Sequence, residues 1–270
     1  MNMSVVRRLT CIFASLFMLA ACTTTTTNTS GLPEARDARA AAEAGDPERR
    51  AQVRLELAGL YFQRGQGDTA LEEVNRALVA KPDLTSAHNL RGLILASLDQ
   101  PAAAEKAFQR ALQLAPDDGS TMHNYGWFLC QQRRYAEGDT QFNAAVAQAS
   151  YRDAPRTYLA QGVCQARAGQ WGDAERSLSR SYELDPANPV TGFNLAEVLL
   201  RRGELERARF YVRRINAIAA QVSAQSLWLA ARIERRLGNV GVLQDLGNQM
   251  RERFPQSPET LLFERGRFDD

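Results

Sequence analysis

The stretch TSAHNLRGLILASLDQPAAAEKAFQRALQLAPDD, from Thr85 to Asp118, carries a pattern that recurs along most of the chain every 34 residues. Its Gly92 aligns with Ala58 in the block before it and with Gly126 in the block after it. Six matches at one period indicate an array of similar units rather than a single globular core. The blocks are 51–84, 85–118, 119–152, 155–188, 189–222 and 223–256.

The period and its residue types resemble the tetratricopeptide repeat (TPR), in which each repeat is a pair of antiparallel helices, A and B. Small residues at recurring positions let the two helices approach closely, and larger apolar residues fill the remaining space. Prolines such as Pro82 and Pro116 end helix B, because proline lacks the N–H that would continue the helix. The sequence therefore predicts an all-α fold, a right-handed superhelical solenoid of six TPR helix pairs whose A helices line a concave groove.

Two joins depart from this pattern. Ser150 and Ala220 stand where proline usually ends helix B, and Asp153 and Ala154 are inserted after the third repeat.

Short segments flank the array on both sides. Residues 33–50 are predicted to form an N-terminal capping helix, and residues 257–270 a C-terminal cap or tail.

The N-terminus has the features of a bacterial lipoprotein signal. Residues 1–21 combine a basic segment with an apolar run that is too short to span a bilayer as a mature helix. They end in Leu-Ala-Ala before Cys22, which resembles a lipobox, so Cys22 is the predicted lipidation site. An ordinary secretory signal cleaved after a small residue is the alternative. Residues 23–31 contain no apolar side chain, and we expect residues 22–32 to form a flexible tether.

The residue after the predicted lipidation site bears on which membrane is used. An Asp there would resemble the inner-membrane retention signal, and the chain has Thr23 instead. We therefore expect a protein held by lipid at the periplasmic face of the outer membrane, where more than one acyl chain gives a firm anchor.

Four cysteines are present, and processing would leave two of them in the repeats. Cys130 and Cys164 lie 34 residues apart on the predicted A helices of repeats 3 and 4, and the periplasm is an oxidising compartment. Packed helices can bring two Cα atoms within the roughly 4.4–6.8 Å that a disulfide needs. We therefore predict a structural Cys130–Cys164 disulfide. Two buried free thiols, or two metal ligands, are the alternatives.

No motif for catalysis or cofactor binding is present. The sequence has neither a nucleophile motif nor a glycine-rich phosphate loop, and its two histidines, His88 and His123, lack further ligands at metal spacing. Removal of residues 1–21 would leave 31 basic and 31 acidic residues, a balance that does not indicate nucleic-acid binding. We expect no enzyme, cofactor, metal or small-molecule substrate, and a function in protein binding.

Positions five and nine of each helix A are expected to face the groove. Their side chains are mostly apolar, with a polar entry at Asn89 and His123, and they suit an amphipathic helix or a hydrophobic peptide. The alternative is that individual side chains pack against the next repeat. The predicted protein-binding groove consists of Leu55, Asn89, Leu93, His123, Trp127, Leu159, Val163 and Phe193.

Arginines crowd repeats 5 and 6, and some acidic residues are interleaved with them. A solvated helix face is the simpler interpretation, and a surface for an acidic partner or lipid is the alternative. The arginines are Arg201, Arg202, Arg207, Arg209, Arg213, Arg214, Arg232, Arg235 and Arg236.

Three strings go beyond the generic repeat: HNYGWFLC at 123–130, YRDAPRTYLAQGVC at 151–164, and SLWLAARIERRLGN at 226–239 followed by RERFPQSPET at 251–260. They resemble the type IV pilus biogenesis and stability lipoproteins, the outer-membrane pilotins often called PilF or PilW. The resemblance covers nearly the whole chain. It implies six repeats, an outer-membrane anchor and the pilus secretin subunit as partner. The implied role is to place the secretin in the outer membrane and to assemble or stabilise its multimers.

The repeats are also compatible with other classes of function. A TPR lipoprotein that acts as a scaffold for peptidoglycan synthesis or cell division is the main alternative. An enzyme with a TPR arm needs a catalytic domain, for which the chain has no room.

Overall fold

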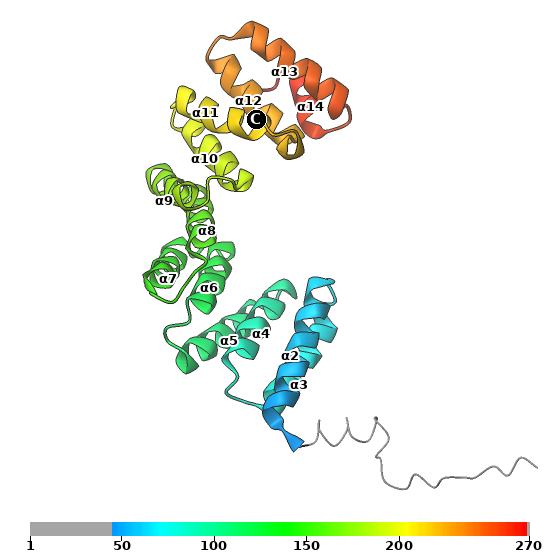
Figure 1. The fold of residues 1–270 in the computed structure, drawn as a ribbon, viewed down its shortest axis with the longest axis vertical. Coiled ribbons are helices and arrows are strands. Elements are labelled where there is room, and N and C mark those ends of the chain that lie inside the picture. The colour runs from blue at the N-terminus through cyan, green and yellow to red at the C-terminus, as the bar shows by residue number, and fades with distance from the viewer. Residues whose placement is uncertain (1–44, 269–270) are drawn as a thin grey trace, which may run out of the picture. The chain divides into compact units, whose positions relative to one another are not determined.

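The computed structural model describes residues 45–268, so the predicted signal, Cys22, the tether and residues 33–44 of the predicted cap lie outside the described part. Within it the chain forms α-helices, and no strand occurs between residues 45 and 268 (Figure 1). The helix pairs, A before B, are α2 (Pro47–Gln63) and α3 (Gly67–Ala80), α4 (Thr85–Ser97) and α5 (Pro101–Leu114), α6 (Gly119–Gln131) and α7 (Tyr135–Ala147), α8 (Ala154–Arg167) and α9 (Trp171–Leu184), α10 (Pro189–Arg201) and α11 (Leu205–Asn216), and α12 (Ala224–Arg236) and α13 (Val240–Arg253). A short 3₁₀ helix, η1 (Ala219–Gln221), precedes α12, and α14 (Pro258–Glu264) follows the last pair. The predicted all-α solenoid of six helix pairs is confirmed.

Helix α2 begins earlier than the sequence pattern suggested. It starts at Pro47, so residues 47–50 belong to the first helix A and not to the predicted capping segment. The reason is local: the Asp46 carboxylate accepts a 3.0 Å hydrogen bond from the backbone N–H of Glu48, and proline at the first helical position has no N–H to leave unpaired. Asn188 and Pro189 start α10 in the same way.

Small residues on helix A set its distance from helix B. A Cβ added to Gly92 would lie 2.7 Å from the ring of Phe108, and one added to Gly162 would lie 2.5 Å from the side chain of Leu178. Both larger side chains are fully buried, so they fill the space that the glycines leave. Substitution of either glycine would push the two helices apart.

The A helices form a continuous row. Each helix A contacts the helix A of the next repeat, and each helix B packs against the helix A that follows it. Successive helices B make no comparable contact in residues 45–268. The repeats therefore converge on the A-helix side, where the free faces of α4, α6, α8 and α10 lie next to one another.

The join between repeats 3 and 4 lacks the proline that usually ends helix B. Side-chain contacts hold this join instead. The ring of Tyr151 packs on Gly119, where a Cβ would lie 2.8 Å from it. The Tyr151 hydroxyl is 2.7 Å from Oγ1 of Thr157, and this oxygen is also 2.8 Å from Nδ1 of His123. A hydrogen-bonded chain thus links Tyr151, just before the insertion, to α8 and α6.

Candidate protein-binding site

An apolar pocket opens on the A-helix side between repeats 3, 4 and 5. Its volume is about 280 Å³, which is enough for one or two large side chains. Helices α6 and α8 supply its walls, and the first turn of α10 supplies its lip. The pocket, called the Trp127 pocket below, is lined by His123, Trp127, Arg156, Leu159, Ala160, Val163 and Val190.

Half of the predicted groove residues meet in this pocket. His123 and Trp127 on α6 are positions five and nine of repeat 3, and Leu159 and Val163 on α8 are the same positions of repeat 4. Val190, at the start of α10, is 54% exposed and forms an apolar edge beside them. These groups form a surface that can receive an apolar side chain of a partner.

The other predicted groove residues lie elsewhere. Leu55, Leu93 and Phe193 are partly buried and pack against the cores of their own parts of the solenoid. Oδ1 of Asn89 accepts a 3.1 Å hydrogen bond from the amide of Asn124 on the next helix A. These four side chains contact neighbouring helices and do not line the Trp127 pocket, as the alternative interpretation expected for individual positions.

His123 does not provide the exposed polar entry that the sequence suggested. Only 5% of the residue is exposed, because Thr157 and Phe142 cover the ring. Burial, with a smaller effect of nearby Arg156, lowers the pKa of His123 to about 4, and Asp153 opposes this shift. His123 is therefore a neutral, mainly structural group beneath the pocket.

Two cations lie close to the pocket opening: Arg156 in the lining, and Arg167 over the ring of Trp127. Arg156 lines the pocket and makes an exposed 3.4 Å ion pair with Asp153. The guanidinium of Arg167 lies 5.0 Å from the ring centre of Trp127 and has no carboxylate partner among residues 45–268. Because exposed ion pairs are weak, both arginines can pair with acidic groups of a partner. The rim thus favours an apolar segment flanked by acidic residues.

Sequence reasoning missed Arg156 and Val190. Both are at position two of their repeats, one turn before the position-five residues that were selected. This position lies in the first turn of helix A, and a side chain there extends toward the preceding repeat. A search of position two in each repeat would have found both.

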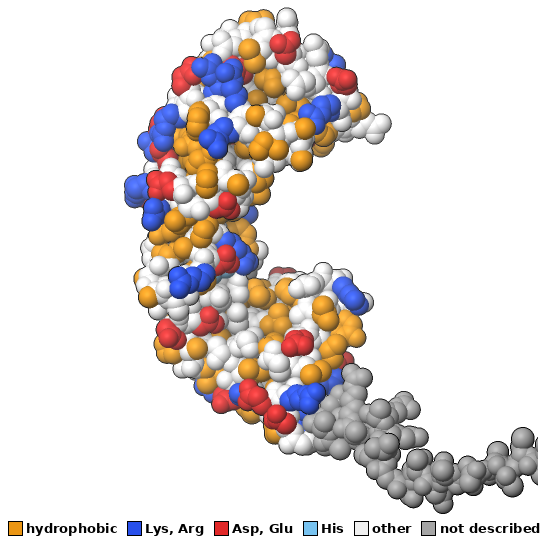
Figure 2. Space-filling view, viewed as in Figure 1, with side chains coloured by type: hydrophobic (Ala, Val, Ile, Leu, Met, Phe, Trp, Pro, Cys, Tyr) orange, Lys and Arg blue, Asp and Glu red, His pale blue; other side chains and the backbone are white. Residues whose placement is uncertain are grey.

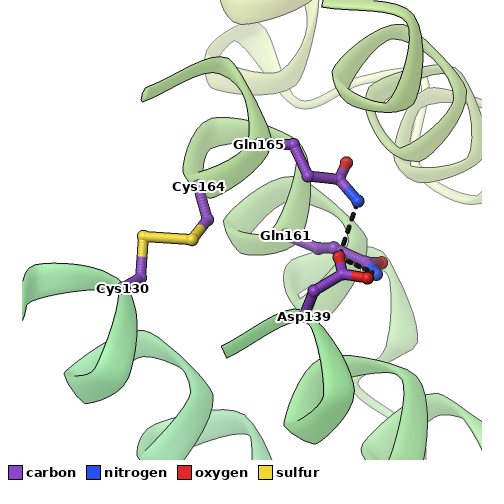
Figure 3. Close-up of a disulfide and its surroundings, with 5 residues drawn as sticks. All are labelled: Cys130, Asp139, Gln161, Cys164 and Gln165. Atoms are coloured by element: carbon purple, nitrogen blue, oxygen red, sulfur yellow. Dashed lines mark hydrogen bonds between the residues drawn. A yellow bond between two sulfur atoms is a disulfide. The ribbon is translucent and has the colours of Figure 1, made fainter. Parts of the chain in front are cut away.

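A disulfide holds the floor of the pocket. Cys130 of α6 and Cys164 of α8 are bonded, and their Cα atoms are 5.8 Å apart (Figure 3). Trp127 and Ala160 pack against the cluster that the two cysteines form with the buried Phe142. On the other side of α8, Asp139 of α7 accepts hydrogen bonds from Gln161 (2.8 Å) and Gln165 (2.6 Å). Helix α8 is therefore fixed on two sides.

The described residues show neither a metal-binding cluster nor a membrane-spanning helix. In the described helices, no three His, Cys, Asp or Glu side chains come together in an arrangement that could hold a metal ion. None of the helices between residues 45 and 268 is long and apolar enough to cross a membrane.

The repeat architecture and the pocket on its A-helix side define a class. Tetratricopeptide repeat models match residues 85–118, 129–189 and 165–232, so the chain is a TPR protein. TPR proteins form a class of protein-interaction modules. The crystal structure of PilW, a widely conserved type IV pilus biogenesis factor, superposes with a TM-score of 0.72 at 30% identity, over 78% of this chain and 96% of PilW. The chain belongs to the PilF/PilW family of type IV pilus biogenesis TPR proteins.

Two further comparisons agree with this membership. The type IV pilus assembly protein PilF of Pseudomonas aeruginosa is 25% identical over 219 residues, which are 81% of this chain and 86% of PilF. The solved structure of Pseudomonas aeruginosa PilF has a TM-score of 0.70 at 22% identity, over 82% of this chain and 99% of that one, and shows the same fold.

Proposed function

We propose that this protein is an outer-membrane pilotin. It is a lipoprotein that binds the pilus secretin subunit and promotes the secretin's outer-membrane localisation and the assembly and stability of its multimers. The observation that carries the proposal is the relationship to PilW, a type IV pilus biogenesis factor, over 96% of that chain. The Trp127 pocket supplies the binding surface that such a role needs.

Binding at the Trp127 pocket follows from its chemistry. An amphipathic segment of the secretin places a large apolar side chain against Trp127, Leu159 and Val163. Burial of one such side chain is worth roughly 1.5–3 kcal/mol. Acidic residues beside it pair with Arg156 and Arg167 at the rim. The disulfide and the Asp139 hydrogen bonds keep the pocket preorganised, which reduces the entropy lost on binding.

The anchor adds a second element to this function. Lipid on Cys22 holds the chain at the outer membrane, and the polar residues after it give the repeats reach into the periplasm. A secretin subunit bound at the repeats is then carried to the membrane where its multimer assembles. Binding and delivery are one step in this scheme, with no chemical reaction.

Deletion of the gene tests the proposal. We expect loss of surface pili and of heat-resistant secretin multimers in the outer membrane, and restoration of both by the wild-type gene. Normal piliation with altered cell shape would overturn the proposal and favour a scaffold for peptidoglycan synthesis or division.

A further inference from the structure

A second cavity, separate from the Trp127 pocket, lies between repeats 4 and 5 and extends to the segment that precedes repeat 6. Its volume is about 450 Å³. The end of α9, the start of α10, the end of α11 and the segment that leads through η1 to α12 surround it. Val190 faces the Trp127 pocket, whereas its neighbour Pro189 lines this second cavity, so the first turn of α10 separates the two. We call it the Arg214 pocket.

The floor of the Arg214 pocket is apolar. Tyr182, Tyr211 and Ile215 form it, and the two tyrosine rings pack edge to face at 4.9 Å. Gly192 also lines it and leaves space that a side chain would fill. At the edge, Ile218 is 50% exposed. This is the join where Ala220 replaces the usual proline, and the irregular segment around η1 leaves the cavity open.

Arg214 differs from most arginines that crowd repeats 5 and 6. Most of the others form ion pairs with carboxylates of the same chain: Arg202 and Arg207 with Glu175, Arg209 with Glu206, Arg213 with Glu234, and Arg232 with Glu197. Arg214 has no carboxylate partner anywhere in residues 45–268. Its guanidinium lies 5.9 Å from the ring centre of Tyr182 and 5.8 Å from that of Phe210, which holds a positive charge beside an apolar cavity.

Two amide side chains complete the rim. Oδ1 of Asn188 accepts hydrogen bonds from the backbone N–H groups of Val190 (3.0 Å) and Thr191 (3.3 Å), so its NH₂ group is left to donate. Gln221 adds a second amide. None of the described side chains that line this pocket is acidic. The rim thus offers a cation and amide donors around an apolar floor, with no competing negative charge.

Figure 2 shows the wider surroundings: over α9 to α11, apolar side chains gather with basic and acidic side chains interspersed among them. Phe210 is 54% exposed in this region, so the apolar surface continues outside the cavity itself.

We propose that the Arg214 pocket binds the C-terminus of a partner polypeptide that ends in a large apolar residue. The apolar side chain enters between Tyr182, Tyr211 and Ile215. The terminal carboxylate pairs with Arg214 and accepts hydrogen bonds from the amide side chains of Asn188 and Gln221. This site is independent of the Trp127 pocket and of the secretin binding proposed there.

A C-terminal residue fits the Arg214 pocket better than an internal acidic residue does, because of where its carboxylate and its apolar side chain lie. A terminal residue carries its carboxylate and its apolar side chain on one Cα, and the Arg214 pocket places its cation and its apolar floor around one cavity. The guanidinium is held against two aromatic rings, so little of its freedom is lost when the carboxylate arrives.

The test uses two synthetic peptides, acetyl-Gly-Ser-Gly-Phe with a free carboxylate and the same peptide as its C-terminal amide. Each is titrated into the purified full chain, and the backbone amide NMR signals of Gly192, Ile218 and Gln221 are followed. We expect saturable shifts with the free acid and at least about tenfold weaker binding of the amide, the loss expected when a charge-assisted hydrogen bond is removed.

Three variants make the test specific. Arg214→Gln should weaken the free acid about tenfold and leave the amide unchanged, because only the carboxylate uses the guanidinium charge. Ile218→Ser should weaken both peptides, because it removes part of the apolar edge. Arg201→Gln, an exposed arginine away from the pocket, is the matched control and should bind like wild type. Equal binding of acid and amide, no shift at the three pocket residues, or an unchanged Arg214→Gln variant would overturn the proposal.

Discussion

Cys130 and Cys164 join α6 to α8 by a disulfide, and seven residues earlier on each helix His123 and Thr157 join the same two helices by a hydrogen bond. Both pairs are 34 residues apart in the sequence, one repeat period. The linked helices flank the join that lacks proline and carries the two-residue insertion. Two side-chain links thus add to the helix packing at this join, and both lie beneath the Trp127 pocket.

The disulfide is expected to stabilise this join. It closes a 34-residue separation, for which the chain-entropy relation gives about 3.8 kcal/mol. Reduction of the wild-type protein should therefore lower the midpoint of urea unfolding. The Cys130→Ala, Cys164→Ala double variant should unfold at the midpoint of the reduced protein and should not respond to reductant. Equal midpoints for oxidised and reduced wild type, or alkylatable thiols in the non-reduced protein, would contradict a stabilising disulfide.

His123 makes stability depend on pH. The folded chain keeps the ring neutral down to its lowered pKa of about 4, whereas the unfolded chain takes up a proton near pH 6.5. The stabilisation is therefore complete above the unfolded pKa and is lost as pH falls from about 6.5 toward 4. The loss is on the order of 3 kcal/mol.

The His123→Gln variant isolates this effect, since glutamine does not titrate and can still hydrogen-bond to Thr157. Free energies of unfolding are measured for both proteins at neutral pH and near the lowered pKa. The difference between wild type and variant should shrink or reverse on acidification. A difference that stays constant with pH would show that His123 does not titrate in this way.

The A-to-B turns give a prediction that no sequence pattern suggested. Each of the six turns has one residue with positive φ, and four of them are glycines. The other two are Asp99 (φ 55°) and Arg133 (φ 60°). A left-handed conformation costs a non-glycine residue roughly 1–2 kcal/mol, which the extra freedom of glycine in the unfolded chain partly offsets.

Arg133→Gly should therefore raise the free energy of unfolding by up to about 1 kcal/mol, measured by urea denaturation. Gly169→Ala, the reverse change at the equivalent turn (φ 75°), should lower it by a similar amount. If Arg133→Gly is destabilising, the arginine side chain contributes more than the relief of its backbone conformation.

The repeat was predictable from sequence because its determinants are local. Gly92 and Gly162 are small because a large side chain of the same repeat packs on each, and the spacing of such pairs is visible in the chain. Trp127 and Leu159 were predictable because positions five and nine of repeats 3 and 4 line the A-helix side, although the same positions of other repeats pack into the cores. The role of Arg214 was not, because it depends on which carboxylates the neighbouring arginines occupy. The same holds for Val190, which joins the Trp127 pocket only through packing between repeats.

Val190 offers a direct test of the Trp127 pocket. It is 54% exposed, so Val190→Asp should change the free energy of unfolding by less than about 0.5 kcal/mol. An aspartate at the lip puts a charge where an apolar partner side chain is buried, and we expect binding of a purified secretin fragment to weaken at least tenfold. Val79→Asp, at an 84% exposed position on α3, is the matched control and should bind normally. Normal binding by both variants would show that the secretin contacts another surface.

Cys22 decides whether the chain is anchored by lipid, and Cys22→Ser tests it. Serine is similar in size to cysteine but cannot form the thioether that carries the lipid. We expect the wild-type protein to fractionate with the outer membrane and the variant to be absent from that fraction, because the acyl chains supply the affinity for this membrane. The variant should still contain the Cys130–Cys164 disulfide on non-reducing analysis, which shows that its repeats have folded.

If binding and delivery are one step, heat-resistant secretin multimers should disappear from the outer membrane of the variant strain, although the protein still binds the secretin fragment in solution. A wild-type protein found in the soluble periplasm would instead establish an ordinary secretory signal. Multimers that persist in the variant strain would show that lipid anchoring and secretin assembly are separate.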